Sequence, residues 1–423
     1  MPKPFVTLLG KTVKYIAQLR GGGSALPGLF VEKIDPHFIR DTLSDLEYGV
    51  VLVSGTNGKT TTTKMVVELL EGQGLKVFTN RTGSNFTRGV AAALLGEVDN
   101  KGNLDADIAV LELDEAHAVH FVAAIAPRYS LLLNVMRDQL DRFGEIDATA
   151  KLLQKITEAT TDTIVLNRED SRIAALADHT SSKNIRYFGL DSSLRDTFPS
   201  DEGLHSPSIL SHSIAHADVA LKSFSGNTAS FVIDTEEATT TLELRGIYNI
   251  YNAAAALALT RAITGESFNQ EKALHTLSKI RPAFGRGETI TVNGQPIELV
   301  LVKNPSGFRL GLQSFPANGY ATMIAINDNY ADGRDMSWLW DVDFDSLREN
   351  GVHTISGVRA YDMALRMQYD EVAVTTVETN ISTALASFID QTTDQPKRIY
   401  CTYTAMTQLR KELSKITDVE VIS

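Results

Sequence analysis

Residues 51–65 read "VLVSGTNGKTTTTKM", and this stretch carries the strongest indication of the fold. An apolar run is followed by a glycine-containing turn and then by threonines and lysines, which predicts a buried strand, a loop and a helix. Small loop residues let backbone N–H groups approach a phosphate, and a helix N-terminus adds partial positive charge. We therefore expect a nucleotide-binding loop made of Gly55, Thr56, Asn57, Gly58, Lys59, Thr60 and Thr61.

Two side chains of this loop have specific expected roles. Lys59 would contact the outer phosphates of the nucleotide, and the Thr60 hydroxyl would bind Mg²⁺. The commoner spacing, G-x-x-x-x-G-K-[ST], needs glycine where this chain has Val53, so the loop is a variant. The plain alternative is a glycine-rich β–α turn capped by threonines. Because the strand, the loop, the Lys-Thr pair and the helix occur together, nucleotide binding is favoured.

Strands and helices alternate on both sides of the loop, which predicts an α/β fold with a parallel sheet. We expect an N-terminal helix and connecting segment over 1–45, followed by a central nucleotide-binding domain over 46–268. Residues 181–245 are rich in Ser, Thr, His and Asp and contain short alternating runs, so a small antiparallel insertion is expected there. The alternation then restarts and predicts a second, Rossmann-like α/β domain over 269–423.

Charge and cysteine content exclude several classes of protein. The net charge of −12 disfavours a nucleic-acid binder, which would show a basic stripe. Cys401 is the only cysteine, so we expect a cytoplasmic protein with no internal disulfide and no zinc. His205, His212 and His216 leave a metal site in the insertion as a weak alternative. The basic, amphipathic N-terminus predicts a surface helix, with peripheral docking on the inner face of the plasma membrane as the minority alternative.

Four further motifs follow the loop in order along the chain. They are "VLELDEAH" (110–117), "NVMRDQLDRFGEID" (134–147), "GIYNIYNAAAA" (246–256) and "FGRGE" (284–288). Together with "GTNGKT" they resemble the superfamily of Mur ligases and folylpolyglutamate synthases, which use ATP and Mg²⁺ to activate a carboxylate as an acyl phosphate.

The resemblance assigns roles to particular residues. It implies that Glu112 holds Mg²⁺ together with Thr60, since carboxylate and hydroxyl oxygens suit a hard cation. It also implies that Asn249, Asn252 and Arg286 contact the nucleotide. Two positions depart from the superfamily pattern, because Gln139 and Tyr248 stand where histidine is usual. Lys151 stands where many Mur ligases carry a carbamylated lysine, and an ordinary surface lysine is an equal alternative there.

The chain is more specifically similar to the MurT family, the Mur-ligase-like subunits of lipid II isoglutaminyl synthase. The similarity rests on "NRTGSNFTRGVAAALL", "RDQLDRFGEID", "LVKNPSGF" and "NDNYADGRDMSWLWDVDF". It implies ATP-dependent amidation of the α-carboxylate of D-glutamate in the lipid II stem peptide at the cytoplasmic membrane face. Ammonia would come from a separate GatD-type glutaminase, since Cys401 lacks the tight glycine turn of a nucleophilic cysteine. An autonomous amino-acid ligase and a non-enzymatic nucleotide-binding scaffold remain as alternatives.

Residues 327–345, "NDNYADGRDMSWLWDVDFD", gather six aspartates and both tryptophans of the chain. The stretch follows a predicted strand, at the end where α/β folds place their sites. The MurT resemblance implies that one aspartate orients the histidine of the glutaminase across the subunit interface, while the tryptophans anchor the loop or bind the partner. Asp335 is the first candidate, and Asp332 and Asp341 are alternatives that the sequence does not separate.

Overall fold

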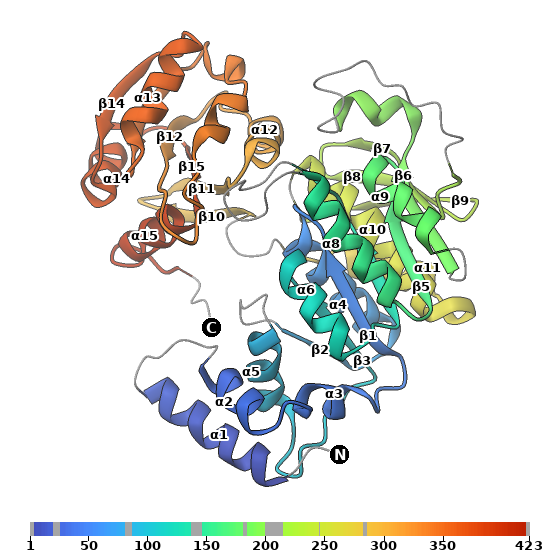
Figure 1. Cartoon of the computed structure of the whole chain (residues 1–423). Helices are drawn as coiled ribbons and strands as arrows, with labels where there is room; N and C mark the ends of the chain where they lie inside the picture. Colours follow the sequence, from blue (N-terminus) through green and yellow to red (C-terminus); the bar gives the residue numbers. More distant parts are fainter. Residues whose placement is uncertain are drawn as a thin grey trace. The chain divides into compact units, whose positions relative to one another are not determined.

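The structure is a computed structural model, and it describes residues 4–19, 26–80, 87–136, 146–180, 184–198, 215–244, 246–281 and 286–419. The chain divides into two compact units (Figure 1). The first consists of Met1–Val135, Asp147–Glu243 and Asn249–Ile280, and the second of Met136–Ile146, Leu244–Tyr248 and Arg281–Ser423. Among the described residues, no helix has both the length and the apolar character needed to cross a bilayer.

The first unit is built on one sheet, whose described strands lie in the order β2-β3-β1-β4-β5-β6-β7-β8-β9. Strand β1 (Gly49–Ser54) lies between β3 and β4 and runs parallel to both. The parallel pairing continues outward to β2 on one side and through β5 and β6 to β7 on the other. The bounds are β2 (Val77–Thr79), β3 (Ile108–Glu112), β4 (Tyr129–Leu132), β5 (Thr163–Asn167) and β6 (Asn184–Leu190).

An antiparallel ribbon completes this sheet. It consists of β7 (Val219–Ser225), β8 (Thr228–Ile233) and β9 (Glu236–Thr241). Gly226, with φ of 57°, forms the tight turn between the first two of these strands. The antiparallel part thus starts later than residue 181, because β6 still pairs in parallel with its neighbour β5.

Helix α4 (Lys59–Gln73) follows β1 and packs on β1, β2 and β3. Helix α10 (Ile247–Thr264) has an alanine row, 253–256, that is fully buried. Near the N-terminus, Lys14 donates to the carbonyl of Ala92 in the middle of α5, and Lys11 donates to that of Val98 just after α5 ends. The other helices are α1 (Pro4–Leu19), α2 (Leu26–Ile34), α3 (Phe38–Leu43), α5 (Thr87–Glu97), α6 (Glu115–Ala124), α8 (Ile146–Ala159), α9 (Ser171–Ala174), α11 (Gln270–Leu277), η1 (Ala175–His179), η2 (Ser192–Thr197) and η4 (Gly265–Ser267).

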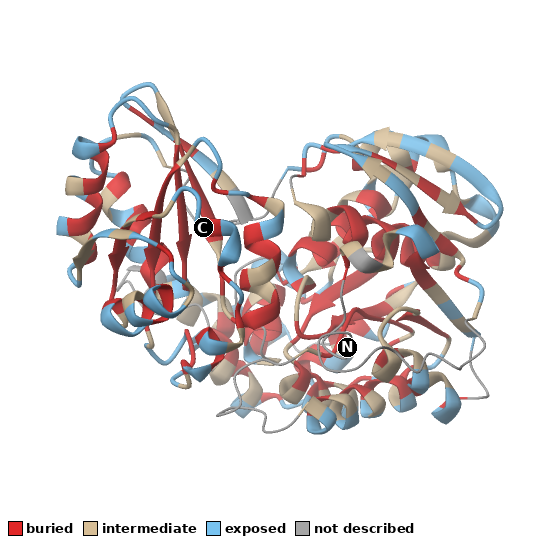
Figure 2. Cartoon of the chain, turned by 90° about the horizontal axis from the view of Figure 1, so that it is seen from above, coloured by how far each residue is buried: buried red, intermediate tan, exposed pale blue. Residues whose placement is uncertain are grey.

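The second unit has its own sheet, in the order β10-β11-β15-β12-β13-β14, parallel except for the β10–β11 hairpin. Its inner strands are buried (Figure 2) because helices cover both faces. Helices α12 and α13 pack in one apolar cluster, and α14 and α15 in the other. The elements are β10 (Arg286–Val292), β11 (Gln295–Leu301), α12 (Pro305–Ser314), β12 (Ala321–Ala325), η5 (Ser337–Asp341), η6 (Asp345–Leu347), β13 (Val352–Ser356), α13 (Ala360–Tyr369), β14 (Val374–Glu378), α14 (Ile381–Gln391), β15 (Lys397–Cys401) and α15 (Tyr403–Leu413).

Candidate active site

The loop expected to bind phosphate lies between the end of β1 and the start of α4. Gly55 and Gly58 have positive φ angles of 131° and 87°. A Cβ atom on Gly55 would lie 2.9 Å from the backbone nitrogen of Asn134, and one on Gly58 would lie 2.8 Å from Nδ2 of Asn252. Both positions therefore require glycine, for the backbone conformation and for the close neighbours.

Asn134, which follows β4, holds the loop from the neighbouring strand. The backbone N–H of Asn57 donates to Oδ1 of Asn134 at 2.8 Å, and Nδ2 of Asn134 donates to the Asn57 carbonyl at 3.0 Å. The backbone N–H of Thr56 donates to the Asn134 carbonyl at 2.9 Å. This buried asparagine thus fixes the backbone of two consecutive loop residues.

The side chain of Lys59 folds back over the loop. Its Nζ donates to the carbonyl of Gly55 at 2.5 Å and lies 3.1 Å from Oε1 of Glu115. Both ionic residues are buried, with 8% of Lys59 and 3% of Glu115 exposed. A buried ammonium is costly without such partners, and these contacts hold it beside the loop backbone.

The pair expected to bind Mg²⁺ is also assembled. The Thr60 hydroxyl donates to Oε1 of Glu112 at 2.8 Å. Asn80 fixes the backbone of Glu112: its Nδ2 donates to the Glu112 carbonyl at 2.8 Å, and its Oδ1 accepts from the Glu112 N–H at 3.0 Å. Hydroxyl and carboxylate oxygens side by side are the ligand types that Mg²⁺ prefers, so these residues fit the implied cation.

Helix α10 supplies the asparagines expected to contact the nucleotide. Asn252 lies against Gly58 of the loop, and Asn249 lies one turn earlier and is half-buried. The hydroxyl of Tyr251 donates to Oδ1 of Asn167, whose Nδ2 donates to the Leu133 carbonyl at 2.7 Å. These bonds tie α10 to the ends of β4 and β5, next to the loop.

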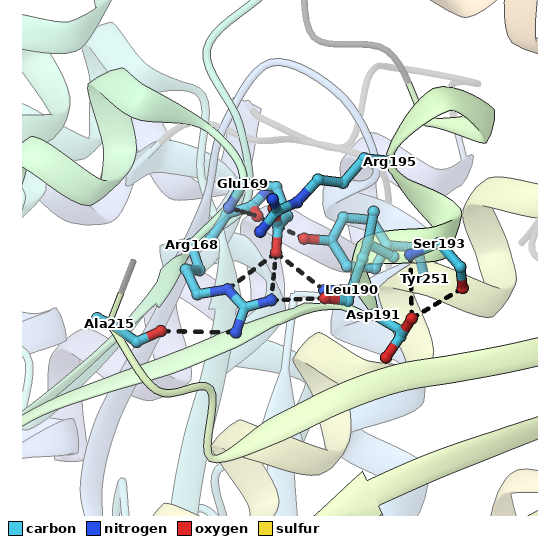
Figure 3. A network of polar contacts seen from close by, with 9 residues as sticks. Arg168, Glu169, Leu190, Asp191, Ser193, Arg195, Ala215 and Tyr251 are labelled. Atoms are coloured by element: carbon cyan, nitrogen blue, oxygen red, sulfur yellow. Dashed lines mark hydrogen bonds and ion pairs between the residues drawn. The ribbon is translucent and has the colours of Figure 1, made fainter. Parts of the chain in front are cut away.

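A charged cluster lies beside Tyr251 (Figure 3). Oε1 of Glu169 accepts from Nε of Arg168 at 2.9 Å and from the N–H of Leu190 at 3.1 Å, and Oε2 accepts from Nε of Arg195 at 3.2 Å. Arg168 also donates to the Leu190 carbonyl. The carboxylate has cationic partners on both oxygens, and the cluster ties the ends of β5 and β6 to η2, which is a structural role.

The aspartate-rich stretch of the second unit leaves β12 and includes η5. Asp332 is 3% exposed, and it accepts from the N–H of Thr404 at 2.8 Å and from the N–H of Asn329 at 3.1 Å. Burial raises the pKa of this carboxyl, against the hydrogen bonds from Thr404. Asp332 therefore ties the stretch to α15. Asp335 is half-buried, and its Oδ1 accepts from the Ser337 N–H at 2.9 Å.

The remaining candidates of this stretch have different surroundings. Asp341 is half-buried, and its backbone carbonyl accepts from Arg309. Trp338 is 3% exposed and packs on Phe308, whereas Trp340 is 47% exposed and contacts the ring of Tyr369. One tryptophan therefore anchors the stretch, and the other presents apolar surface to solvent.

Other sequence candidates lie apart from these groups or outside the described residues. Lys151 is exposed on α8, and Arg286 begins β10 in the second unit. Cys401 is fully buried in β15, and burial raises the pKa of its thiol, so it is a poor nucleophile. Gln139, His205 and His212 fall in segments that the structure does not describe.

The second unit contains a further group of carboxylates. In the described part of the chain, the carboxylates close enough to share a cation are those of Asp343, Asp345 and Asp370. Asp345 pairs with Arg348, and Asp370 with Arg366, so a metal role is not indicated. His216, which precedes β7, is exposed and joins no such group.

Sequence reasoning assigned no role to Asn80, Asn134 or Glu115. All three are polar residues directly after or shortly after parallel strands, and all three stand inside motifs quoted above. The rule that sites form at the carboxyl ends of parallel strands would have identified them.

Family models match two segments of the chain. The Mur ligase middle domain matches residues 53–260, and the MurT ligase C-terminal domain matches residues 301–406. Among solved structures, MurF from Acinetobacter baumannii is similar with a TM-score of 0.70 at 19% identity, covering 92% of this chain and 80% of that one. Folylpolyglutamate synthase from Thermotoga maritima has a TM-score of 0.58 at 16% identity, covering 89% and 93%. These structures support the Mur-ligase-like α/β fold.

Curated relatives are more specific. The protein named lipid II isoglutaminyl synthase (glutamine-hydrolyzing) subunit MurT from Streptococcus pneumoniae is 31% identical, over 96% of this chain and 96% of its own length. The protein of the same name from Staphylococcus aureus is 27% identical, over 87% and 88%. The fold and this similarity over 96% of the chain identify the protein as a member of the MurT family of Mur-ligase-like proteins.

Proposed function

We propose that this protein is the synthetase subunit of a lipid II isoglutaminyl synthase, which amidates the α-carboxylate of D-glutamate in the stem peptide with ATP. The observation that carries the proposal is the joint placement of Lys59, Thr60 and Glu112 at the ends of β1 and β3. The names of the Streptococcus pneumoniae and Staphylococcus aureus relatives support the choice of substrate and the glutamine-dependent reaction.

The first half-reaction activates the carboxylate. A carboxylate oxygen attacks the γ-phosphorus of ATP, ADP leaves, and an acyl phosphate forms. The loop N–H groups and Lys59 bind the phosphates and offset the charge on the transferring group. Thr60 and Glu112 would hold Mg²⁺, which neutralises phosphate charge. Asn134 and Asn80 keep the loop and Glu112 in place.

The second half-reaction consumes ammonia. Ammonia attacks the acyl carbon, loses a proton, and phosphate leaves with one of the original carboxylate oxygens. Glutamine hydrolysis needs an activated nucleophile, and the buried Cys401 does not fit that role. We infer that a GatD-type glutaminase subunit supplies the ammonia, and that Asp335 orients the histidine of that partner, with Asp332 and Asp341 as alternatives.

The test is amidation of lipid II in vitro. The purified protein is given lipid II, ATP, Mg²⁺ and an ammonium salt, and the stem peptide is analysed by mass spectrometry. The proposal expects the mass change for replacement of a carboxylate hydroxyl by an amino group, dependent on ATP. Glutamine should replace the ammonium salt only when the glutaminase subunit is present.

A different outcome would favour the second candidate. If lipid II is unchanged while ATP is consumed in the presence of an amino-acid acceptor and no partner, the protein is an autonomous ligase. The similarity to a folylpolyglutamate synthase structure, at 16% identity, supports only the shared fold and does not favour that reading.

A further inference from the structure

Glu115 lies in the nucleotide site without a role in the chemistry proposed above. It is the first residue of α6, after Asp114, whose side chain accepts from the N–H of Ala116. Its side chain is buried, and its carboxylate lies 3.1 Å from Nζ of Lys59, whose side chain is also buried. Within the described residues, this carboxylate accepts a hydrogen bond from Lys59.

The contacts of Lys59 show what a phosphate would have to displace. Its ammonium has three N–H donors. Nζ lies 2.5 Å from the carbonyl of Gly55, 3.4 Å from that of Thr56, and 3.1 Å from Oε1 of Glu115. The two carbonyls belong to the loop itself, and Glu115 belongs to another element. Among these three contacts, the one with Glu115 can be exchanged for a phosphate oxygen without distorting the loop.

We propose that Glu115 is a positioning residue of the nucleotide site, which holds Lys59 in the empty loop and is displaced from it when a phosphate binds. The inference rests on the proposed nucleotide binding. Glu115 would be needed when no phosphate is bound, because an ammonium buried without a counter-ion is strongly destabilising. The same carboxylate would weaken nucleotide binding, because it competes with the phosphate for the ammonium of Lys59.

Glu112 and Glu115 thus have different expected roles beside the loop. Oε1 of Glu112 accepts from the hydroxyl of Thr60 at 2.8 Å and belongs with the proposed cation site. Glu115 contacts the lysine instead. Removing the charge of Glu115 should therefore strengthen the binding of a metal-free nucleotide through Lys59, whereas loss of a purely structural residue would not.

The test measures ADP affinity by calorimetry in the presence of EDTA, so that no cation contributes. If Glu115 holds Lys59 in nine-tenths of the empty molecules, Glu115→Gln should bind ADP about tenfold more tightly than the wild type. Glutamine keeps the size and an acceptor oxygen. Glu115→Asp keeps the charge on a shorter side chain, so its affinity should fall between the two, and it serves as the second variant if Glu115→Gln does not fold.

Two controls make the result specific. Glu298→Gln neutralises another buried ion pair, with Arg398 in the second unit, and should leave ADP affinity unchanged. In a Lys59→Met background, Glu115→Gln should change ADP affinity less than twofold, because the effect acts through the lysine.

The inference is overturned if folded Glu115→Gln binds ADP no more tightly than the wild type, or if it tightens binding equally in the Lys59→Met background. The latter result would mean direct repulsion of phosphate by the carboxylate. Failure of the wild type to bind any adenine nucleotide would instead refute the proposed function, so the two failures are distinguishable.

Discussion

At the scale of single residues, the proposed function depends most on Lys59. Replacing it by alanine should lower ATP-dependent amidation by roughly 10²–10³-fold, because a charge that stabilises the transferring phosphoryl group is lost. The backbone of the loop is fixed by Asn134, so the fold should persist. The measurement is amidation with an ammonium salt, with circular dichroism to confirm folding.

The matched control for Lys59 lies on the same helix. Lys64 is half-buried and pairs with Glu68 at 3.8 Å, one turn along α4. Lys64→Ala should retain nearly full activity, since surface pairs of this kind contribute little. If folded Lys59→Ala keeps wild-type activity, Lys59 does not take part in the proposed reaction.

The residues of the site differ in how far the sequence could predict them. Lys59 and Thr60 lie in one contiguous motif whose spacing has a physical meaning, so their positions beside each other were predictable. Asn80 fixes Glu112 from 32 positions away along the chain, and Asn134 fixes Asn57 of the loop from 77 positions away. Such contacts depend on the order of strands in the sheet, which local patterns do not specify.

At the scale of elements, the turn from β1 into α4 is closed by Gly58. Gly58→Ala should weaken ATP binding roughly tenfold or more, because φ of 87° strains any other residue and the new Cβ would lie 2.8 Å from Asn252. Nucleotide affinity by calorimetry is the measurement. Gly74→Ala is the matched control: it has φ of 102° and no neighbour within 4 Å, so it should lose stability but keep nucleotide affinity.

The N-terminus of α9 makes stability depend on pH. Asp170 caps this helix and accepts from the Val135 N–H at 2.7 Å, and burial raises the pKa of its carboxyl from 3.8 to about 6. The folded protein therefore binds the proton more tightly than the unfolded chain does. This contribution to stability is complete below about pH 4 and is lost as the pH rises to about 6.

Asp170→Asn should remove that dependence. Between pH 4 and pH 7 the free energy of unfolding of the wild type should fall relative to that of the variant, by at most about 3 kcal/mol. Denaturant unfolding at both pH values is the measurement. Asp191→Asn is the control: hydrogen bonds from Ser193 lower the pKa of Asp191 from 3.8, so its contribution is lost only at more acid pH, and this variant should keep the wild-type change between pH 4 and pH 7. Parallel pH profiles of the wild type and Asp170→Asn would refute the prediction.

The alternation of strands and helices predicted both sheets, because buried parallel strands are short continuous apolar runs. It predicted the position of the antiparallel ribbon less well. Strand β6 alternates polar and apolar residues over its first half, as an antiparallel strand would, yet it pairs in parallel with β5. Its place in the sheet follows from tertiary pairing, which outweighs the local pattern.

At the scale of the whole molecule, the proposed reaction needs a second protein. Asp335→Asn should leave amidation with an ammonium salt intact and lower glutamine-dependent amidation by roughly 10²–10⁴-fold, because a histidine without its orienting acid is a poor base. Co-purification should show that the complex still forms. Asp343→Asn, in the same stretch and exposed, should change neither rate. Normal glutamine hydrolysis by the Asp335→Asn complex would direct the same assay to Asp332 and Asp341.

The proposed acyl phosphate can be tested by following one oxygen atom through the reaction. Lipid II whose D-glutamate α-carboxylate is labelled with ¹⁸O is incubated with the protein, ATP, Mg²⁺ and an ammonium salt, and the released inorganic phosphate is analysed by mass spectrometry. Activation as an acyl phosphate predicts that each amidation transfers one ¹⁸O atom from the carboxylate to the phosphate. Formation of the amide with unlabelled phosphate would show that the carboxylate is not activated as an acyl phosphate.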